Sequence, residues 1–314
     1  MADDEQLIAS LPKDLGLLAP SEMCLYQGFW CPTIYIPHII SFQKHFQAQH
    51  QDTIVASVPK CGTTWLKSLV FSIVNRTRYD SSTTPLLSSN PHPLVPFLEL
   101  EVFSKKDVPD LTTIPSPRLF STHLPYAALS ESIRNSDASV VYICRNPFDA
   151  VVSLCHHLDE LKSNSEAQKS MEEAFDIYFK GIAGYGPFWD HVLGYWKVSL
   201  EKPKKVLFLK YEDLKEDIVG ELKRIAEFIG YPFSEEEERQ GIIQEIAKLC
   251  SFSSLKRLEA NSSGTYLEVH PNSVFFRKGN VGEWVDYISP SLKQRLENVM
   301  SEKLSGSGLS FKLS

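Results

Sequence analysis

Short apolar runs alternate along the chain with longer segments of helical periodicity. Four runs have the composition of strands: Thr53–Val58, Arg118–Ser121, Val140–Cys144 and Val206–Lys210. Each is short and nearly continuous in apolar residues, which is typical of a parallel strand buried on both faces. The pattern therefore predicts a central parallel sheet.

Helical patterns follow three of these runs. They cover Thr63–Asn75, Phe148–Leu161 and a stretch after the last strand that ends at Gly230 and Pro232, where a C-terminal stop is expected. This alternation predicts an α/β fold in which helices flank the parallel sheet. We expect a single domain over residues 1–314, with residues 1–20 as a flexible N-terminus.

Two longer segments lack a clear periodicity. Ser81–Pro96 is rich in Ser, Thr and Pro and is expected to form a surface loop. Asn261–Asn280 is also irregular, and loops of this length in a compact domain often serve as functional lids. The acidic run Glu235–Arg239 is expected to begin a solvated helix.

Composition narrows the class of protein. The chain has 314 residues, 43% of them hydrophobic, which is enough for one sizeable core. The net charge of −7 argues against nucleic acid or an anionic membrane as the main partner, although it permits a basic pocket. No apolar run is long enough to span a membrane, and the acidic N-terminal sequence does not resemble a secretory signal. Six cysteines without a CxxC pair fit a reducing compartment, so we expect a cytoplasmic protein.

The segment SVPKCGTTWLKSLV lies between a predicted strand and a predicted helix. Gly62 allows a tight turn, and Thr63 and Thr64 lie in the first turn of the helix, where N–H groups and hydroxyls can converge on an anion. Lys60 adds a positive charge. A plain strand-to-helix turn with an exposed lysine is the alternative. The nucleotide-triphosphatase loop differs, because its lysine follows the last glycine.

The motif PKCGTTWLK resembles the 5′-phosphosulfate loop of the cytosolic sulfotransferases, which use 3′-phosphoadenosine 5′-phosphosulfate (PAPS). Three further segments are similar to motifs of that family: CRNPFDAVVS, LKYEDL and FFRKGNVGEW. Their order and wide separation span most of the chain. The segments AEFIGYPF and LCSF are most similar to the plant branch of the family, which includes flavonol, steroid and hydroxyjasmonate sulfotransferases.

The resemblance implies a donor site. Lys60 would contact the bridging oxygen of PAPS and stabilise the charge that develops on the leaving phosphate. The 5′-phosphate would lie against Cys61, Gly62, Thr63 and Thr64. The 3′-phosphate would be bound by Arg145, Ser153, Arg277, Lys278 and Gly279, since arginine forks suit phosphate oxygens. The adenine side would consist of Trp65, Tyr211, Phe252 and, with less support because the family often has a hydroxyl there, Cys250.

The resemblance also implies a general base, His123, in the sequence STHLPY. His156 and His157 lie on a predicted helix and are expected to be packing or surface residues. The sequence differs from many animal members of the family at two places. Ser121 stands where many of them have a lysine, and the segment EWVDYISPS lacks their C-terminal dimer motif. A sulfuryl group carries less charge than a phosphoryl group, so we expect neither a second cation nor a metal. We expect a monomer or a weak homodimer.

The implied partner is a small hydroxylated acceptor, mostly apolar, such as a flavonoid, a phenol or a steroid. An aromatic-lined cleft suits such molecules. The candidate lining is Tyr26, Phe29, Trp30, Tyr126, Tyr185, Phe188 and Trp189, and for most of these an ordinary core position is the open alternative.

Two other functions stay open from the sequence. One is a catalytically impaired relative that binds PAPS or its product, 3′-phosphoadenosine 5′-phosphate (PAP). Ser121 favours this alternative, and the presence of Lys60 and His123 disfavours it. The other is a P-loop kinase or NTPase, which the position of Lys60 before Gly62 disfavours.

Overall fold

A four-stranded parallel sheet forms the centre of the computed structural model, which describes residues 2–16, 22–161 and 170–313. Its strands are β4 (Thr53–Ser57), β5 (Leu119–Thr122), β6 (Ser139–Cys144) and β7 (Val206–Lys210), in the spatial order β5-β4-β6-β7. All neighbours are parallel. This confirms the predicted α/β fold, with strand ends that differ from the expected ones by at most one residue.

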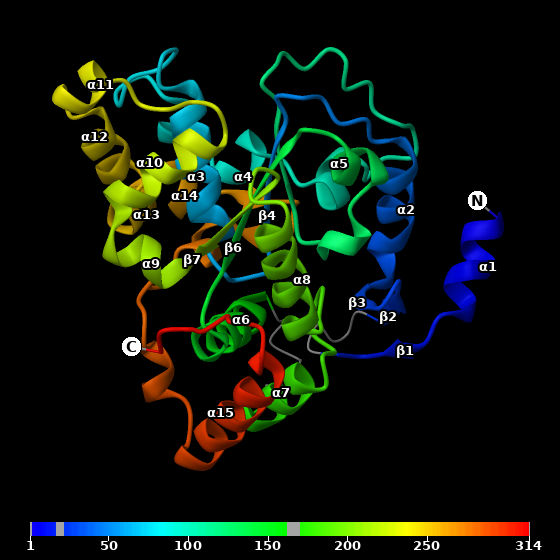
Figure 1. Ribbon diagram of the computed structural model, residues 1–314. Coiled ribbons are helices and arrows are strands. Elements are labelled where there is room, and N and C mark those ends of the chain that lie inside the picture. Colours follow the sequence, from blue (N-terminus) through cyan, green and yellow to red (C-terminus); the bar gives the residue numbers. More distant parts are fainter. Residues whose placement is uncertain (1, 17–21, 162–169, 314) are drawn as a thin grey trace.

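Helices cover both faces of this sheet (Figure 1). Helices α3 (Thr63–Asn75), α10 (Ile218–Phe228) and α12 (Ile242–Leu249) pack with the strand residues Val55 and Val141 in one core. On the other face are α2 (Ile36–His45), α6 (Pro147–Leu161) and α8 (Phe188–Glu201). Their core includes Ile54, Val140 and Tyr142. Successive strand residues thus enter opposite cores, which is why each strand is apolar throughout.

The predicted helical stretch after β7 is divided into two. Helix α9 (Tyr211–Glu216) follows the strand directly, and α10 starts after Asp217. The Asp217 side chain accepts a hydrogen bond of 2.9 Å from the amide of Gly220, so it caps α10 and separates the two helices.

An N-terminal antiparallel sheet was not predicted. It contains β1 (Lys13–Asp14), β2 (Met23–Tyr26) and β3 (Phe29–Pro32). Helix α1 (Ala2–Ser10) precedes it, within the segment expected to be flexible; residues 1 and 17–20 of that segment lie outside the described residues.

The segment Ser81–Pro96 is more ordered than a surface loop. It contains a 3₁₀ turn, η2 (Pro85–Leu87), and a short helix, α4 (Pro91–Leu94). Asn90 and His92 are buried. The side chain of Asn90 accepts from the amide of His92 at 3.0 Å and donates to Asn261 at 3.0 Å. Ser81, Ser82, Thr83 and Ser88 are exposed as expected of a surface loop, whereas the buried polar groups of Asn90 and His92 are hydrogen-bonded.

The irregular segment after residue 261 folds over the carboxyl edge of the sheet. It contains a small hairpin, β8 (Thr265–Tyr266) and β9 (His270–Pro271), and a 3₁₀ turn, η5 (Asn272–Phe275). Residues of both line the cavity described below, as expected for a lid-like segment.

The remaining elements complete the outer layers. The α-helices are α5 (Glu131–Asn135), α7 (Met171–Phe179), α11 (Glu235–Arg239), α13 (Phe252–Arg257), α14 (Glu259–Ser262) and α15 (Pro290–Leu304). The other turns are η1 (Thr33–Tyr35), η3 (Leu98–Val102, a π-helix), η4 (Tyr126–Ala128) and η6 (Glu283–Asp286). Within the described ranges, no helix combines the length and apolarity needed to cross a bilayer.

Candidate active site

Four candidate side chains follow the carboxyl ends of the four parallel strands. Lys60 lies in the loop after β4, His123 directly follows β5, Arg145 directly follows β6, and Tyr211 directly follows β7. Because parallel strands end at the same edge of a sheet, these residues come together there. They line one cavity of about 650 Å³.

Most of the residues predicted for the site line this cavity. They are Lys60, Gly62, Thr63, Thr64, Trp65, His123, Arg145, Ser153, Tyr211, Phe252, Arg277, Lys278 and Gly279. The thiols of Cys61 and Cys250 are fully buried in the two cores instead. The Cys250 sulfur lies 3.3 Å from the Ser72 hydroxyl, and the adjacent Ser251 lines the cavity.

The loop between β4 and α3 has the backbone shape of an anion cradle. Lys60 and Gly62 both have positive φ angles, 67° and 107°. A Cβ added at Gly62 would lie 2.8 Å from the ring of Tyr211, so only glycine fits without displacement of that ring. The first residue of α3, Thr63, has its hydroxyl 2.5 Å from that of Ser57. Gly62, Thr63 and Thr64 line the cavity, so the amides at the start of α3, which have no partner within the helix, lie at its wall.

The ammonium of Lys60 is held at the cavity by a backbone carbonyl. Its Nζ donates to Val274 O at 3.4 Å. Burial, together with the charges of Arg277 and Arg145, lowers the pKa of Lys60 to about 7, although the carboxylate of Glu160 raises it. The charge on Lys60 is therefore sensitive to any anion that enters the cavity.

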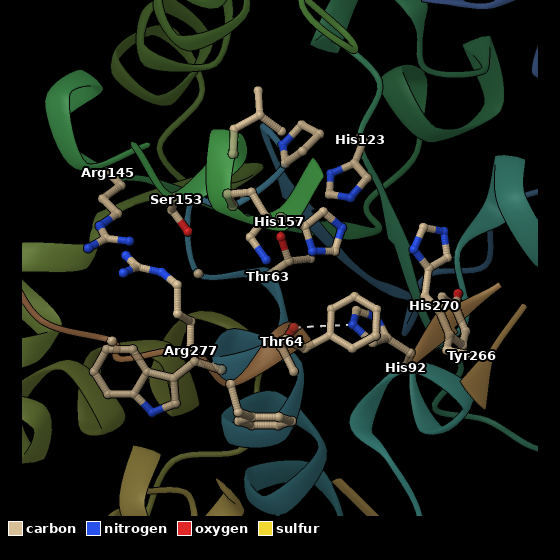
Figure 2. Close-up of a pocket in the computed structure, with 18 of the residues that line it drawn as sticks. Thr63, Thr64, His92, His123, Arg145, Ser153, His157, Tyr266, His270 and Arg277 are labelled. Atoms are coloured by element: carbon tan, nitrogen blue, oxygen red, sulfur yellow. Dashed lines mark hydrogen bonds between the residues drawn. The ribbon is translucent and has the colours of Figure 1, made fainter. Parts of the chain in front are cut away.

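Two arginines from distant segments face the same space, with the Ser153 hydroxyl beside them (Figure 2). Arg145 lies 3.5 Å from Asp149, and Arg277 lies 2.6 Å from Glu283. In both guanidinium groups the Nε–H is buried without a hydrogen-bond partner among the described residues. Buried donors of this kind require an acceptor, and a phosphate dianion would supply several oxygens at once.

Asp149 joins the two segments that carry these arginines. It lies on α6, and its carboxylate accepts from the amides of Gly282 at 2.8 Å and Trp284 at 3.1 Å. The C-terminal loop that holds Arg277 is thereby fixed to the helix that follows Arg145.

Aromatic rings lie beside the two arginines, and the guanidinium carbon of Arg145 is 4.7 Å from the centroid of the Tyr211 ring. Trp65 and Tyr211 make an edge contact with a centroid distance of 5.2 Å, and the Tyr211 hydroxyl donates to Gly279 O at 2.8 Å. A Cβ at Gly279 would lie 2.5 Å from the Phe252 ring, so the loop passes directly against that ring. This arrangement leaves planar apolar surface next to the cationic groups.

His123 has the tautomer expected of a base. Its Nδ1 lies 2.8 Å from Ser57 O, a carbonyl that can only accept, so Nδ1 carries the hydrogen and Nε2 keeps a free lone pair. Its amide donates to Glu99 at 2.7 Å, which fixes the backbone after β5. Burial lowers the pKa of His123 to about 3, against the bond to Ser57 that raises it, so the ring is neutral at physiological pH.

Comparison with known proteins identifies the family. Residues 50–308 match the model of the sulfotransferase domain. The chain belongs to the sulfotransferase family. It is 50% identical to cytosolic sulfotransferase 15 of Arabidopsis thaliana, in an alignment covering 99% of this chain and 87% of the relative. Identity to cytosolic sulfotransferase 14 of the same plant is 49%, over 99% and 91% of the two chains. The protein is thus an enzyme of the sulfotransferase class, similar to plant members, and the names of these relatives agree with the expected cytoplasmic location.

Solved structures of the family show the same architecture. A provisionally named steroid sulphotransferase of Arabidopsis thaliana is 40% identical, with a TM-score of 0.77 and coverage of 98% of this chain and 94% of that chain. Mouse sulfotransferase SULT7A1, complexed with PAP, is 27% identical, with a TM-score of 0.72 and coverage of 91% and 95%.

Sequence reasoning missed part of the sulfotransferase cavity. His92, His157 and His270 line it together with His123, although His157 was expected to be a packing or surface residue. Burial lowers the pKa of His157 to about 2, so this ring too is neutral. The helical pattern of Phe148–Leu161 does not show that His157 faces a cavity, and His92 lies in a segment expected to be a surface loop, so no sequence signal marks either residue.

The predicted acceptor lining was largely wrong. Of the seven aromatic residues named for it, Tyr185 lines the cavity. Tyr26, Phe29, Phe188 and Trp189 are buried in the core, and Trp30 and Tyr126 are partly buried away from the cavity. Their apolar character serves packing, which was the alternative interpretation. The aromatic lining comes instead from Tyr35, Phe97, Tyr266 and Phe275.

Proposed function

We propose that this sulfotransferase transfers a sulfuryl group from PAPS to a hydroxyl of a small, mostly apolar acceptor such as a flavonoid, phenol or steroid. One observation carries the proposal: a cation, a neutral imidazole with a free Nε2, and two arginines with unpartnered buried Nε–H groups border the same cavity. A single ligand with an apolar ring, two phosphates and a transferable group would use all of these.

The donor site fits PAPS in the chemistry of its side chains. Arg145, Ser153, Arg277, Lys278 and the backbone at Gly279 would bind the 3′-phosphate, and the buried unpartnered Nε atoms provide the donors that this phosphate needs. Gly62, Thr63, Thr64 and the amide of Cys61 would bind the 5′-phosphate. Trp65, Tyr211 and Phe252 would flank adenine, with Cys250 behind them in the core. The PAP complex of the mouse relative supports this choice of ligand. When bound, PAPS supplies an activated sulfuryl group.

Lys60 would stabilise the leaving phosphate. Its ammonium can donate to the bridging oxygen, where negative charge accumulates as the bond to sulfur breaks, so the contact strengthens in the transition state. An anionic donor also opposes the burial that lowers the Lys60 pKa to about 7, and thus keeps the residue charged when it is needed.

His123 would accept the proton of the attacking hydroxyl at Nε2. Prior ionisation of a phenol by a histidine of ordinary pKa would already cost about 3.5 pKa units, or roughly 5 kcal/mol, and the lowered pKa of His123 makes this cost larger. Removal of the proton during attack avoids most of this cost, and such general-base assistance is worth about 10²–10⁴ in rate. The bond from Nδ1 to Ser57 O stabilises the imidazolium that results.

The acceptor end of the cavity is apolar. Its lining includes Tyr35, Phe97, Leu100, Tyr185, Leu267 and Val269, beside His123. Flat ring systems would bury their faces there and present one hydroxyl to His123. The name of the Arabidopsis steroid sulphotransferase supports an acceptor of this kind.

Ser121 supplies no second cation to the reaction. It is fully buried, and its hydroxyl donates to Val95 O at 3.0 Å. We infer that Lys60 suffices for a weakly charged sulfuryl group and that no metal takes part. We also infer a monomer or weak homodimer, without nucleic-acid or membrane partners; light scattering across a concentration series tests the oligomeric state.

A sulfation assay with radiolabelled PAPS and a panel of phenols, flavonoids and steroids tests the proposal. We expect transfer by the wild type and a loss of about 10²–10⁴ in turnover in His123→Ala, while calorimetry shows PAP binding retained in the variant. Binding of PAP without transfer to any acceptor would indicate the impaired relative. Magnesium-dependent ATP hydrolysis instead of sulfation would indicate a P-loop NTPase. Unchanged turnover in His123→Ala would rule out its role as base.

A further inference from the structure

A buried lysine and a buried histidine lie directly behind the donor loop. Lys67 is on α3, one helical turn after Thr64, and its Nζ lies 2.9 Å from Nδ1 of His92. Nε2 of the same imidazole lies 3.1 Å from the Thr64 hydroxyl (Figure 2). Both Lys67 and His92 are buried, with exposed fractions of 0% and 3%. The three groups form a chain that ends at the cavity, which Thr64 lines.

The chemistry of the three groups sets the direction of this chain. A lysine ammonium can only donate hydrogen bonds, so Nδ1 of His92 must accept. The neutral ring then carries its hydrogen on Nε2 and donates it to the Thr64 oxygen. The single hydrogen of the Thr64 hydroxyl is left to donate to a further acceptor. The opposite direction would start from a neutral amine and would turn the lone pairs of Thr64 toward the cavity, where they would repel an anion.

The aromatic face beside Lys67 stabilises its ammonium form. Its Nζ lies 3.4 Å from the centroid of the Phe97 ring, a cation–π contact. Burial lowers the pKa of Lys67 well below its usual value, and the carboxylates of Glu101 and Glu99 raise it only in part, so the ammonium is the form that the tautomer of His92 must test. The imidazole of His92 is kept neutral, because burial and the adjacent Lys67 lower its pKa. Its plane is fixed by stacking on Phe97 at 5.5 Å and on Tyr266 at 4.7 Å.

We propose that Lys67 and His92 are positioning residues that orient the Thr64 hydroxyl as a hydrogen-bond donor to the 5′-phosphosulfate end of PAPS. This inference rests on the proposed function, since it presumes an anion at the β4–α3 loop. Neither residue touches the donor through its own charge in this scheme; both act through Thr64.

Nuclear magnetic resonance tests the direction of the chain without any turnover. In ¹⁵N-histidine-labelled protein, with His92 assigned by comparison with His92→Phe, we expect the Nε2–H tautomer both in the free chain and with PAP. The Nδ1–H tautomer or an imidazolium would overturn the proposal.

Calorimetry tests the consequence for binding. His92→Phe keeps an aromatic ring in the stack, and Lys67→Met keeps an unbranched chain of similar length. Because a hydrogen bond to a charged group is involved, we expect each to weaken PAP binding by roughly tenfold. Binding of adenosine 3′-phosphate, which lacks the 5′-phosphate, should be unchanged. In a Thr64→Val background, His92→Phe should cause no further loss.

Comparison of PAP with adenosine 3′-phosphate distinguishes a loss of positioning at Thr64 from general damage to the binding site. An equal loss of affinity for PAP and adenosine 3′-phosphate, or an undiminished loss in the Thr64→Val background, would contradict the proposal. Failure of the wild type to bind PAP would contradict the proposed function instead, while the tautomer measurement would still decide the direction of the hydrogen bonds.

Discussion

The charge of Lys60 depends on what occupies the cavity. Without a bound anion, three causes favour the neutral amine, namely burial and the charges of Arg277 and Arg145, and the pKa is about 7 against a usual 10.5. At pH 8 the side chain is therefore largely neutral. Below pH 6 it is charged in any case. A phosphate next to Nζ favours the ammonium and raises this pKa.

We therefore predict that PAP binding at pH 8 takes up close to one proton through Lys60. Isothermal titration calorimetry in buffers of different ionisation enthalpy measures this number. Lys60→Met is the control, because PAP itself also exchanges protons near pH 6. Equal proton uptake by the wild type and Lys60→Met at pH 8 would show that Lys60 keeps its charge in the free enzyme.

At the scale of elements, the C-terminal loop depends on the close approach of Gly279 to α13. A Cβ at Gly279 would lie 2.5 Å from Phe252, and φ there is 69°. Gly306 has a similar φ of 72° but no atom within 4 Å of an added Cβ. Alanine substitutions at these two glycines can therefore be compared. Both introduce backbone strain, but only the substitution at Gly279 would also displace the loop.

We predict that Gly279→Ala weakens PAP binding at least tenfold, because the loop must move and Arg277 moves with it. Gly306→Ala should bind PAP as the wild type does, with a loss of about 1 kcal/mol in the free energy of unfolding, the cost of a positive φ at alanine. Calorimetry and urea denaturation measure the two quantities. Similar affinities in both variants would mean that the loop adapts without moving Arg277.

The parallel sheet and the residues at its carboxyl edge could be predicted because they depend on local pattern. A continuous apolar run identifies a strand buried on both faces, and the polar residue after it, such as His123 or Arg145, must then lie at the common edge. Gly62 and Thr63 are identifiable for the same reason, since a strand, a glycine and a helix follow each other directly.

The rest of the site depends on packing between distant segments. His92 lies in a stretch whose Ser, Thr and Pro content is typical of loops, and its burial follows from bonds to Thr64 and Lys67 that no local pattern encodes. Most of the aromatic residues expected in the acceptor cleft pack in the core, while Tyr185 lines the cavity. They could not be told apart beforehand, because composition does not distinguish a ring that lines a cavity from one that is buried.

At the scale of the whole molecule, the amino edge of the sheet is closed by a buried ion pair. Arg118 precedes β5 and Asp52 precedes β4, with side chains exposed by only 2% and 1% and an N–O distance of 2.5 Å. Arg118 also donates to Gln47 O at 2.9 Å. This edge and the carboxyl edge that borders the cavity lie at opposite ends of the same strands.

We predict that Asp52→Ala lowers the free energy of unfolding by about 3–5 kcal/mol, because it leaves a buried guanidinium without a counter-charge. The matched control is Asp137→Ala: its partner His50 lies 3.7 Å away, both side chains are exposed by 80% or more, and the expected change is below about 1 kcal/mol. Urea denaturation compares the two. A loss in Asp52→Ala no larger than in the control would mean that the edge is held by packing alone.

Asp149 has a consequence for how donor preference can change. Its carboxylate accepts hydrogen bonds from the amides of Gly282 and Trp284 and forms an ion pair with Arg145. The segments that carry the two arginines of the proposed phosphate pocket are therefore both held by this one residue. A change of preference toward a nucleotide without a 3′-phosphate would therefore have to alter both arginine-bearing segments together. We infer that the architecture maintains the proposed preference for a doubly phosphorylated donor, whereas the proposed acceptor end, which consists of separate apolar side chains, can change one residue at a time.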